Sequence, residues 1–120
     1  MNLVLVEHAD GVATDVSLQA LALAAELGGE THALLIGPGG LEAAASVPVA
    51  VAHVAEHEAL AEFAPDARAA IICGVAERLG ATAVVAPGTG PATDAMARVA
   101  VRLGEPLATN VIGKFVCRDQ

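Results

Sequence analysis

The chain has 120 residues, 55% of them hydrophobic, and a net charge of −8 with six Lys and Arg residues in total. This length fits one domain that can bury its own core, and no apolar run reaches the roughly 18–20 residues that span a bilayer. Six cations cannot neutralise many phosphates, so the composition argues against a nucleic-acid surface. With two Phe and no Tyr or Trp, aromatic stacking platforms are largely excluded and the core must be aliphatic.

The two cysteines and the start of the chain indicate the compartment. Cys73 and Cys117 are too few for a disulfide framework, which favours a reducing environment. The apolar run over 3–6 has no basic region before it and a charged Glu7 directly after it, which is typical of a strand and not of a signal peptide. We therefore expect a cytoplasmic protein without a membrane segment.

The first half of the chain alternates strands and helices. Apolar runs predict strands over residues 3–6, 31–36 and 49–54. A short Ala-rich helix is expected over 41–45, between the second and third strands.

A longer helix is expected between the first two strands. A loop over 7–11 leads to Thr14 or Asp15, either of which is a good N-cap. The helix runs to about Leu27, and Gly28-Gly29 ends it. Its expected inward face is formed by Leu18, Leu21, Ala22 and Ala25.

The second half continues the alternation. A helix begins at Pro65-Asp66 and ends at Gly80, with an inward stripe of Ile71, Ile72, Val75 and Leu79. A strand over 82–86 and a helix over about 93–103 follow, and then a strand over 107–112. The pattern predicts an α/β fold: a three-layer, open, parallel, Rossmann-like sheet of about five strands. Residues 1–112 form this domain, and 113–120 begin an incomplete hairpin or tail.

The loop Pro87-Gly88-Thr89-Gly90 is the first candidate site, because it follows a strand and precedes a helix. It lacks a third glycine, since Thr93 stands there, and it lacks the Gly-Lys-Ser/Thr ending of a P-loop. The pattern favours a tight turn near a helix start. A phosphate or nucleotide cradle at Gly88, Thr89 and Gly90 is the alternative.

Other polar constellations are weaker. His53-Val54-Ala55-Glu56-His57 matches the inverted zinc-protease pattern, but His53 ends a predicted strand, so we reject a metal there. Glu7 and His8 follow the first strand and suggest an acid–base pair, yet no nucleophile accompanies them, and solvent-facing loop residues are the simpler interpretation. Cys73 is expected to be a buried helix residue. No catalytic residue is predicted.

Arg98 and Arg102 stand four residues apart on the last helix and form a small positive spot on an acidic protein, to which Arg78 can add. A solvated helix face is the default interpretation. Contact with a partner protein is the alternative.

The chain also resembles a family. The segment Leu3-Val4-Leu5-Val6-Glu7-His8, the Asp-Gly turn after it, and 17–21 and 24–29 are similar to the opening of electron transfer flavoprotein alpha subunits. Residues 86–89, 97–103 and 107–112 extend the similarity in the same order over nearly the whole chain. Ala95-Met96-Ala97 lacks the proline common in that helix of the family, which puts the contacts of Arg98 in question.

This resemblance implies an adenine-nucleotide-alpha-hydrolase-like domain that docks on a beta subunit in a heterodimer. The family carries electrons from dehydrogenases through FAD, whose main binding elements lie in a second domain, and its AMP belongs to the beta subunit. No residue of this chain matches the flavin-binding motifs, so no cofactor is expected on this chain alone. The alternative is a standalone nucleotide-binding module resembling universal stress proteins, although the glycine pattern that this second family uses for ATP is absent after the strand over 82–86.

Overall fold

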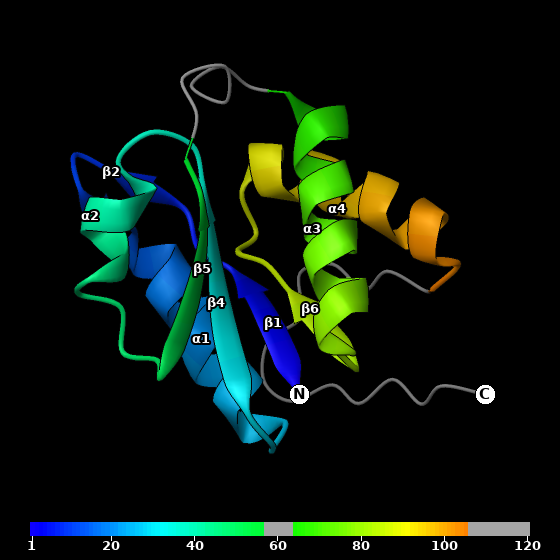
Figure 1. Ribbon diagram of the computed structural model, residues 1–120, viewed down its shortest axis with the longest axis horizontal. Coiled ribbons are helices and arrows are strands. Elements are labelled where there is room, and N and C mark those ends of the chain that lie inside the picture. The colour runs from blue at the N-terminus through cyan, green and yellow to red at the C-terminus, as the bar shows by residue number, and fades with distance from the viewer. Residues whose placement is uncertain (57–63, 106–120) are drawn as a thin grey trace.

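The computed structural model describes residues 1–56 and 64–105; the strand expected over 107–112 and the tail 113–120 lie outside this part. The described part contains a parallel sheet of four strands in the order β5-β4-β1-β6 (Figure 1). Their bounds are β1 (Asn2–Leu5), β4 (Thr31–Ile36), β5 (Val51–Ala55) and β6 (Ala83–Val85). The predicted parallel α/β class is therefore confirmed.

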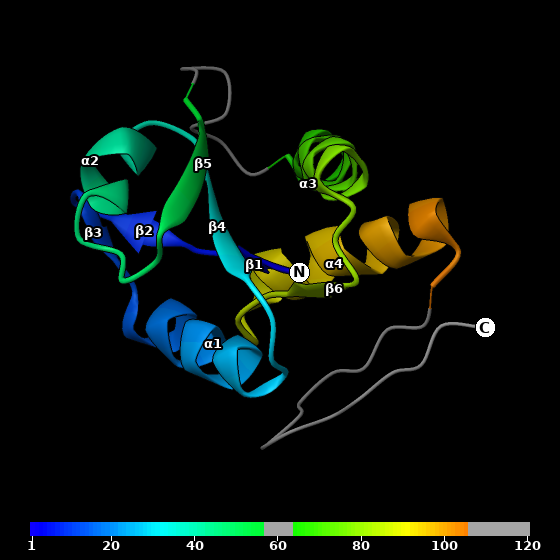
Figure 2. The same ribbon diagram turned by 60° about the horizontal axis from the view of Figure 1, so that its bottom comes forward.

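Helices cover both faces of this sheet, as Figure 2 shows for α1 and α3. Their bounds are α1 (Asp15–Glu26), α2 (Gly40–Ala44), α3 (Pro65–Leu79) and α4 (Gly90–Leu103). None of the helices in residues 1–56 and 64–105 is long and apolar enough to cross a membrane.

The sheet lies between two layers of helices, and β1 contacts both because it is buried over its whole length. Successive side chains of a strand point to opposite faces of the sheet. Leu3 and Leu5 face α3 and α4, whereas Val4 and Val6 face α1 and α2. The α3/α4 side is closed mainly by Ala69, Ile72, Cys73, Val75, Ala76, Ala92, Ala95, Met96 and Val99. The α1/α2 side is closed mainly by Ala20, Leu21, Ala24, Ala43 and Val47. Small alanines let the helix backbones approach the sheet closely.

The buried face of α1 differs from the prediction. Of the four residues expected to point inward only Leu21 is buried; the buried residues are Ser17, Ala20, Leu21 and Ala24. The expected residues Leu18, Ala22 and Ala25 are exposed. The reason is that the Ser17 hydroxyl is bonded to the backbone after β1, which sets the rotation of the helix about its axis.

The segment predicted as a loop over 7–11 contains a small antiparallel hairpin of β2 (His8–Ala9) and β3 (Val12–Ala13). Its turn has Asp10 at φ 54° and Gly11 at φ 75°. Two successive positive φ angles define a type I′ turn, for which Asp-Gly is a preferred pair. The turn was visible in the sequence, but strands of two residues are too short to produce an apolar pattern.

The strand order places the expected site. The chain runs outward from β1 through β4 to β5 and then returns to the opposite side of β1 as β6. Strand order therefore reverses between β1 and β6. In open α/β sheets, ligands bind at the carboxyl ends of the strands beside such a point.

Candidate functional site

The strand order reverses between β1 and β6, and we call this place the switch point. The loops that follow these two strands meet there through Glu7 and Thr89. The Thr89 hydroxyl lies 2.9 and 3.0 Å from the two carboxylate oxygens of Glu7, to which it donates. The two residues are 82 positions apart in the chain. The structure therefore joins two candidates that the sequence analysis treated separately.

Glu7 is held by a hydrogen-bond network at the start of α1. Its backbone N–H donates to the Ser17 hydroxyl over 2.8 Å, and the Thr14 hydroxyl donates to the same Ser17 oxygen over 2.8 Å. The Thr14 N–H in turn donates to the Glu7 carbonyl over 2.9 Å. Ser17 is fully buried, so its hydroxyl is a fixed internal partner and is out of reach as a nucleophile.

Thr89 is the N-cap of α4, and its side-chain oxygen accepts from the Ala92 N–H over 3.3 Å. The helix begins at Gly90 with Pro91 in its first turn, three residues earlier than predicted. Gly88 and Gly90 do not adopt a positive φ, and no neighbouring atom lies within 4 Å of a Cβ built on either one. Neither glycine is therefore required by a strained turn or a crowded contact.

The position of Glu7 decides between the two interpretations of this loop. A helix N-terminus attracts anions through its free N–H groups and its dipole. Here the Glu7 carboxylate is bonded to the capping residue of α4 and supplies that negative charge from within the chain. A phosphate placed at Gly88-Thr89-Gly90 would meet a like charge. The geometry therefore favours a capped turn over a phosphate cradle.

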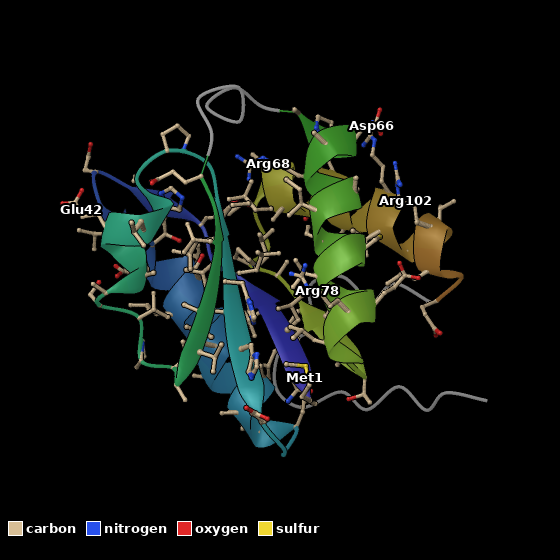
Figure 3. All side chains as sticks on the ribbon, in the orientation of Figure 1. Met1, Glu42, Asp66, Arg68, Arg78 and Arg102 are labelled. Carbon is tan, nitrogen blue, oxygen red and sulfur yellow. The ribbon has the colours of Figure 1, made fainter. Side chains whose placement is uncertain are left out.

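A cation also approaches this end of the molecule. Arg68, on the first turns of α3, points away from Arg102 in Figure 3. Its Nε atom is buried and has no hydrogen-bond partner among the described residues. An anionic group at this end of the molecule would find its counter-charge in Arg68, because the α4 N-terminus already faces the Glu7 carboxylate.

The structure does not combine Glu7 and His8 into an acid–base pair. Whereas Glu7 faces Thr89, the His8 ring nitrogen Nε2 lies 3.1 Å from the Ile36 carbonyl, to which it donates. Glu56, at the end of β5, accepts from the Gly39 N–H over 2.9 Å. The two side chains thus tie down the loop that follows β4.

His53 lies in the middle of β5 and not at the end of a strand as predicted, and His57 lies outside the described residues. Its Nε2 is 3.0 Å from Nδ1 of His32 on β4, and His32 Nε2 is 2.8 Å from a Glu30 carboxylate oxygen. His53 is thus half-buried and paired, not a free surface residue. In residues 1–56 and 64–105, no group of three or more His, Cys, Asp or Glu is arranged to hold a metal ion.

The hydrogen bonds that link Glu30, His32 and His53 predict a loss of stability in acid. Burial, and then the charges of His32 and Arg78, lower the pKa of His53. The unfolded chain, with an ordinary histidine pKa of about 6.5, binds that proton more readily. Stability contributed by neutral His53 is therefore present above about pH 6.5 and is lost as pH falls toward the lower folded pKa.

Melting temperatures recorded from pH 8 downward test this expectation. His53→Gln, which keeps a polar side chain beside His32, should melt with a shallower pH dependence than the wild type below about pH 6.5. Equal slopes for the two proteins would contradict it. The bond to His32 also lowers the pKa of Glu30, so a second loss is expected in more acidic solution in both proteins.

The three arginines of the predicted positive spot, Arg98, Arg102 and Arg78, lie in three different environments. Arg98 bonds to Asp94, one turn earlier on α4, and to Asp66 on α3 over 2.8 Å. Arg102 is exposed farther along α4. Arg78 does not extend the spot: Figure 3 shows it on the opposite side of α3 from Arg102, and its charge acts on His53.

Cys73 is buried in the α3/α4 core, as predicted, and this burial raises the pKa of its thiol. A thiol in that state is a poor nucleophile. Cys117 lies outside the described residues.

Ser17 and His32 were not predicted from the sequence as site residues. Ser17 was hidden in a helix whose inward face was assigned to larger apolar residues; the predicted N-cap Thr14 does accept from the Ser17 N–H, but that pattern does not show that the Ser17 side chain is buried. His32 stands in a predicted strand, two residues before Leu34 and therefore on the same face. Its pairing with His53 depends on strand register, which the sequence alone did not supply.

Comparison with known proteins identifies the family. The family model for the electron transfer flavoprotein domain matches residues 2–116, which is nearly the whole chain. No curated protein matches the chain. The chain belongs to the electron transfer flavoprotein domain family.

Proposed function

We propose that this chain is the N-terminal domain, or a truncated relative, of an electron transfer flavoprotein alpha subunit. In this role it holds a beta subunit in a heterodimer while FAD, bound by other domains, carries electrons from dehydrogenases. The domain contributes a scaffold and performs no catalytic step itself. The family match over residues 2–116 is the observation that carries the proposal.

The geometry at the switch point agrees with a scaffolding role. The carboxyl edge, where related folds bind ligands, is closed on itself by the Glu7–Thr89 contact. Ser17 lies near that edge and is fully buried. Its hydroxyl accepts from the Glu7 backbone N–H. The Thr89 hydroxyl lies beside the Glu7 carboxylate, but its oxygen also accepts from the Ala92 N–H as the cap of α4, so it is held as a structural group. The side chains there stabilise loops.

We further propose that the exposed face of α4 around Arg98 and Arg102 contacts the partner subunit. The two residues differ in what they do inside the domain. Arg98 joins α4 to α3 through Asp66 and also pairs with Asp94 on its own helix, so its replacement disturbs the contact between the helices. Arg102 is exposed and makes no ion pair among the described residues, which makes it the cleaner probe of docking.

Arg102→Glu should therefore weaken binding to a beta-type subunit by roughly tenfold, because it replaces an attractive charge with a repulsive one. The melting temperature of the isolated chain should stay within about 2 °C of the wild type, as is usual for exposed positions. Arg78→Glu is the matched control, since it makes the same charge change on the other side of α3. Equal affinities for the Arg102 and Arg78 variants would remove α4 from the proposed interface.

The isolated chain should be colourless after purification and should show no flavin absorbance in the visible range, because the flavin belongs to other domains. An absorbance spectrum of the purified chain checks this directly. Bound flavin would show that the chain carries its own cofactor site and would contradict a purely scaffolding role.

A standalone nucleotide-binding module is the second candidate, and the position of the α4 N-terminus at the switch point is the observation in its favour. The Glu7 carboxylate opposes this role, because it places a negative charge at the α4 N-terminus. Titration of the isolated chain with ATP distinguishes the two candidates: saturable binding favours the nucleotide module, and co-purification with a beta-type subunit favours the scaffold.

A further inference from the structure

His32 and His53 bring two imidazole rings together on the side of the sheet that faces α3. His32 comes from β4 and His53 from the neighbouring strand β5, in a register that pairs Leu34 with His53. The two ring centroids are 5.2 Å apart, with 28° between the ring planes. His32 is buried and His53 is half-buried, so the pair is reached from the His53 side.

Glu30 sets the protonation of this pair. Its carboxylate can only accept when ionised, so the His32 nitrogen Nε2, at 2.8 Å, carries the proton and donates. The other nitrogen of His32, Nδ1, is then left with its lone pair. That lone pair points to the nearest nitrogen of His53, at 3.0 Å.

A carboxylate that orients one nitrogen of a histidine while the other nitrogen faces a shared point is the arrangement found around bound zinc. On a tetrahedral Zn²⁺, two imidazole nitrogens each about 2.0–2.1 Å from the metal lie about 3.3 Å apart. The 3.0 Å separation of His32 Nδ1 and His53 Nε2 is close to this value. If the shared proton moves to Nδ1 of His53 and the rings turn so that both nitrogens face one point, the ion can enter between them.

We propose that His32 Nδ1 and His53 Nε2 bind a divalent transition-metal ion of the Zn²⁺ class, with Glu30 as the positioning residue. Imidazole nitrogen suits Zn²⁺, whereas Mg²⁺ and Ca²⁺ prefer oxygen. Two protein ligands leave the remaining positions to water, so the ion is held less tightly than in a four-ligand structural site. Binding would link the edge strand β5 to β4.

The charged groups around the pair predict how binding depends on pH. Glu30 is beside His32, and Arg78 on α3 acts on His53 from the other side. The carboxylate favours a bound cation and the guanidinium opposes it. Both imidazoles must be neutral at the ligating nitrogen, so affinity for Zn²⁺ should fall as the solution becomes acidic.

Calorimetric titration of the full chain with Zn²⁺ near pH 7.5 tests the proposal. His53→Gln and His32→Gln should each weaken binding at least about tenfold, and Glu30→Gln by about 10- to 100-fold. His8→Gln is the matched control, because it removes an imidazole that lies apart from the pair and should bind as the wild type does. Mg²⁺ should produce no binding heat with any of these proteins.

A second measurement needs no variant. Nitrogen NMR of the wild-type histidine rings should show Zn²⁺ shifting His32 Nδ1 and His53 Nε2, while His32 Nε2 keeps its proton. The proposal is overturned if Zn²⁺ does not bind the wild type, if the double variant of His32 and His53 binds equally well, or if those two nitrogen signals do not respond.

Discussion

Ile72→Ala should lower the free energy of unfolding by about 2–5 kcal/mol. Ile72 is completely buried in the middle of α3, where it packs in the same core as Leu3, Leu5 and Leu34 of the sheet. Its truncation removes apolar burial and leaves a cavity that close-packed neighbours fill only in part. Because domains of this size are stable by about 5–15 kcal/mol, the loss is a large share of the total.

Chemical denaturation of the purified chain measures this effect. The smaller truncation Ile72→Val should lower the free energy of unfolding by about 0.5–1.5 kcal/mol. Val101→Ala is the control: Val101 is 82% exposed on α4, so its truncation creates no cavity and should be nearly neutral. An Ile72→Ala protein as stable as the Val101→Ala protein would show that α3 does not pack on the sheet as described.

Ser17→Ala should lower the free energy of unfolding by about 1–3 kcal/mol, although it removes a single oxygen atom. The Ser17 hydroxyl is the partner of both the Glu7 N–H and the Thr14 hydroxyl. Without it, two donors beside a fully buried position lose their acceptor, and an unsatisfied buried donor is costly. The same change frees the loop that holds Glu7 against Thr89.

The matched control is Ser46→Ala, because Ser46 is exposed and its hydroxyl donates only to the Ala43 carbonyl nearby. Its effect should stay within about 0.5 kcal/mol. Amide hydrogen exchange adds a site-specific measurement: the Glu7 amide should exchange faster in the Ser17 variant and at the wild-type rate in the Ser46 variant. Similar behaviour of both variants would contradict the role given to Ser17.

Most of the fold could be predicted from local patterns. The strand over 31–36 and the helix beginning at Pro65 and ending at Gly80 have the bounds expected from apolar runs, a helix-starting proline and a closing glycine. The rotation of α1 could not be predicted, because it depends on a hydrogen bond between Ser17 and a residue ten positions earlier. The fifth strand expected over 107–112 remains a prediction, since it lies outside the described residues.

Some residues of the site could be predicted from the sequence, but the contacts between them could not. Glu7 and Thr89 were both recognised as residues at the carboxyl ends of strands, but the sequence does not state that those two strands are neighbours. The same limit applies to His32 and His53, whose meeting depends on the register of β4 against β5. Contacts between residues distant in sequence are set by strand order, and strand order is a property of the whole fold.

Co-purification with a beta-type electron transfer flavoprotein subunit tests the central claim most directly. The full chain is co-expressed with that subunit, purified through a tag on one partner, and separated by size-exclusion chromatography. Our account predicts that the two proteins elute together in equal amounts and that the chain alone elutes separately and without flavin. Independent elution of the two proteins, under conditions where both are folded, would contradict the proposed role as a docking scaffold.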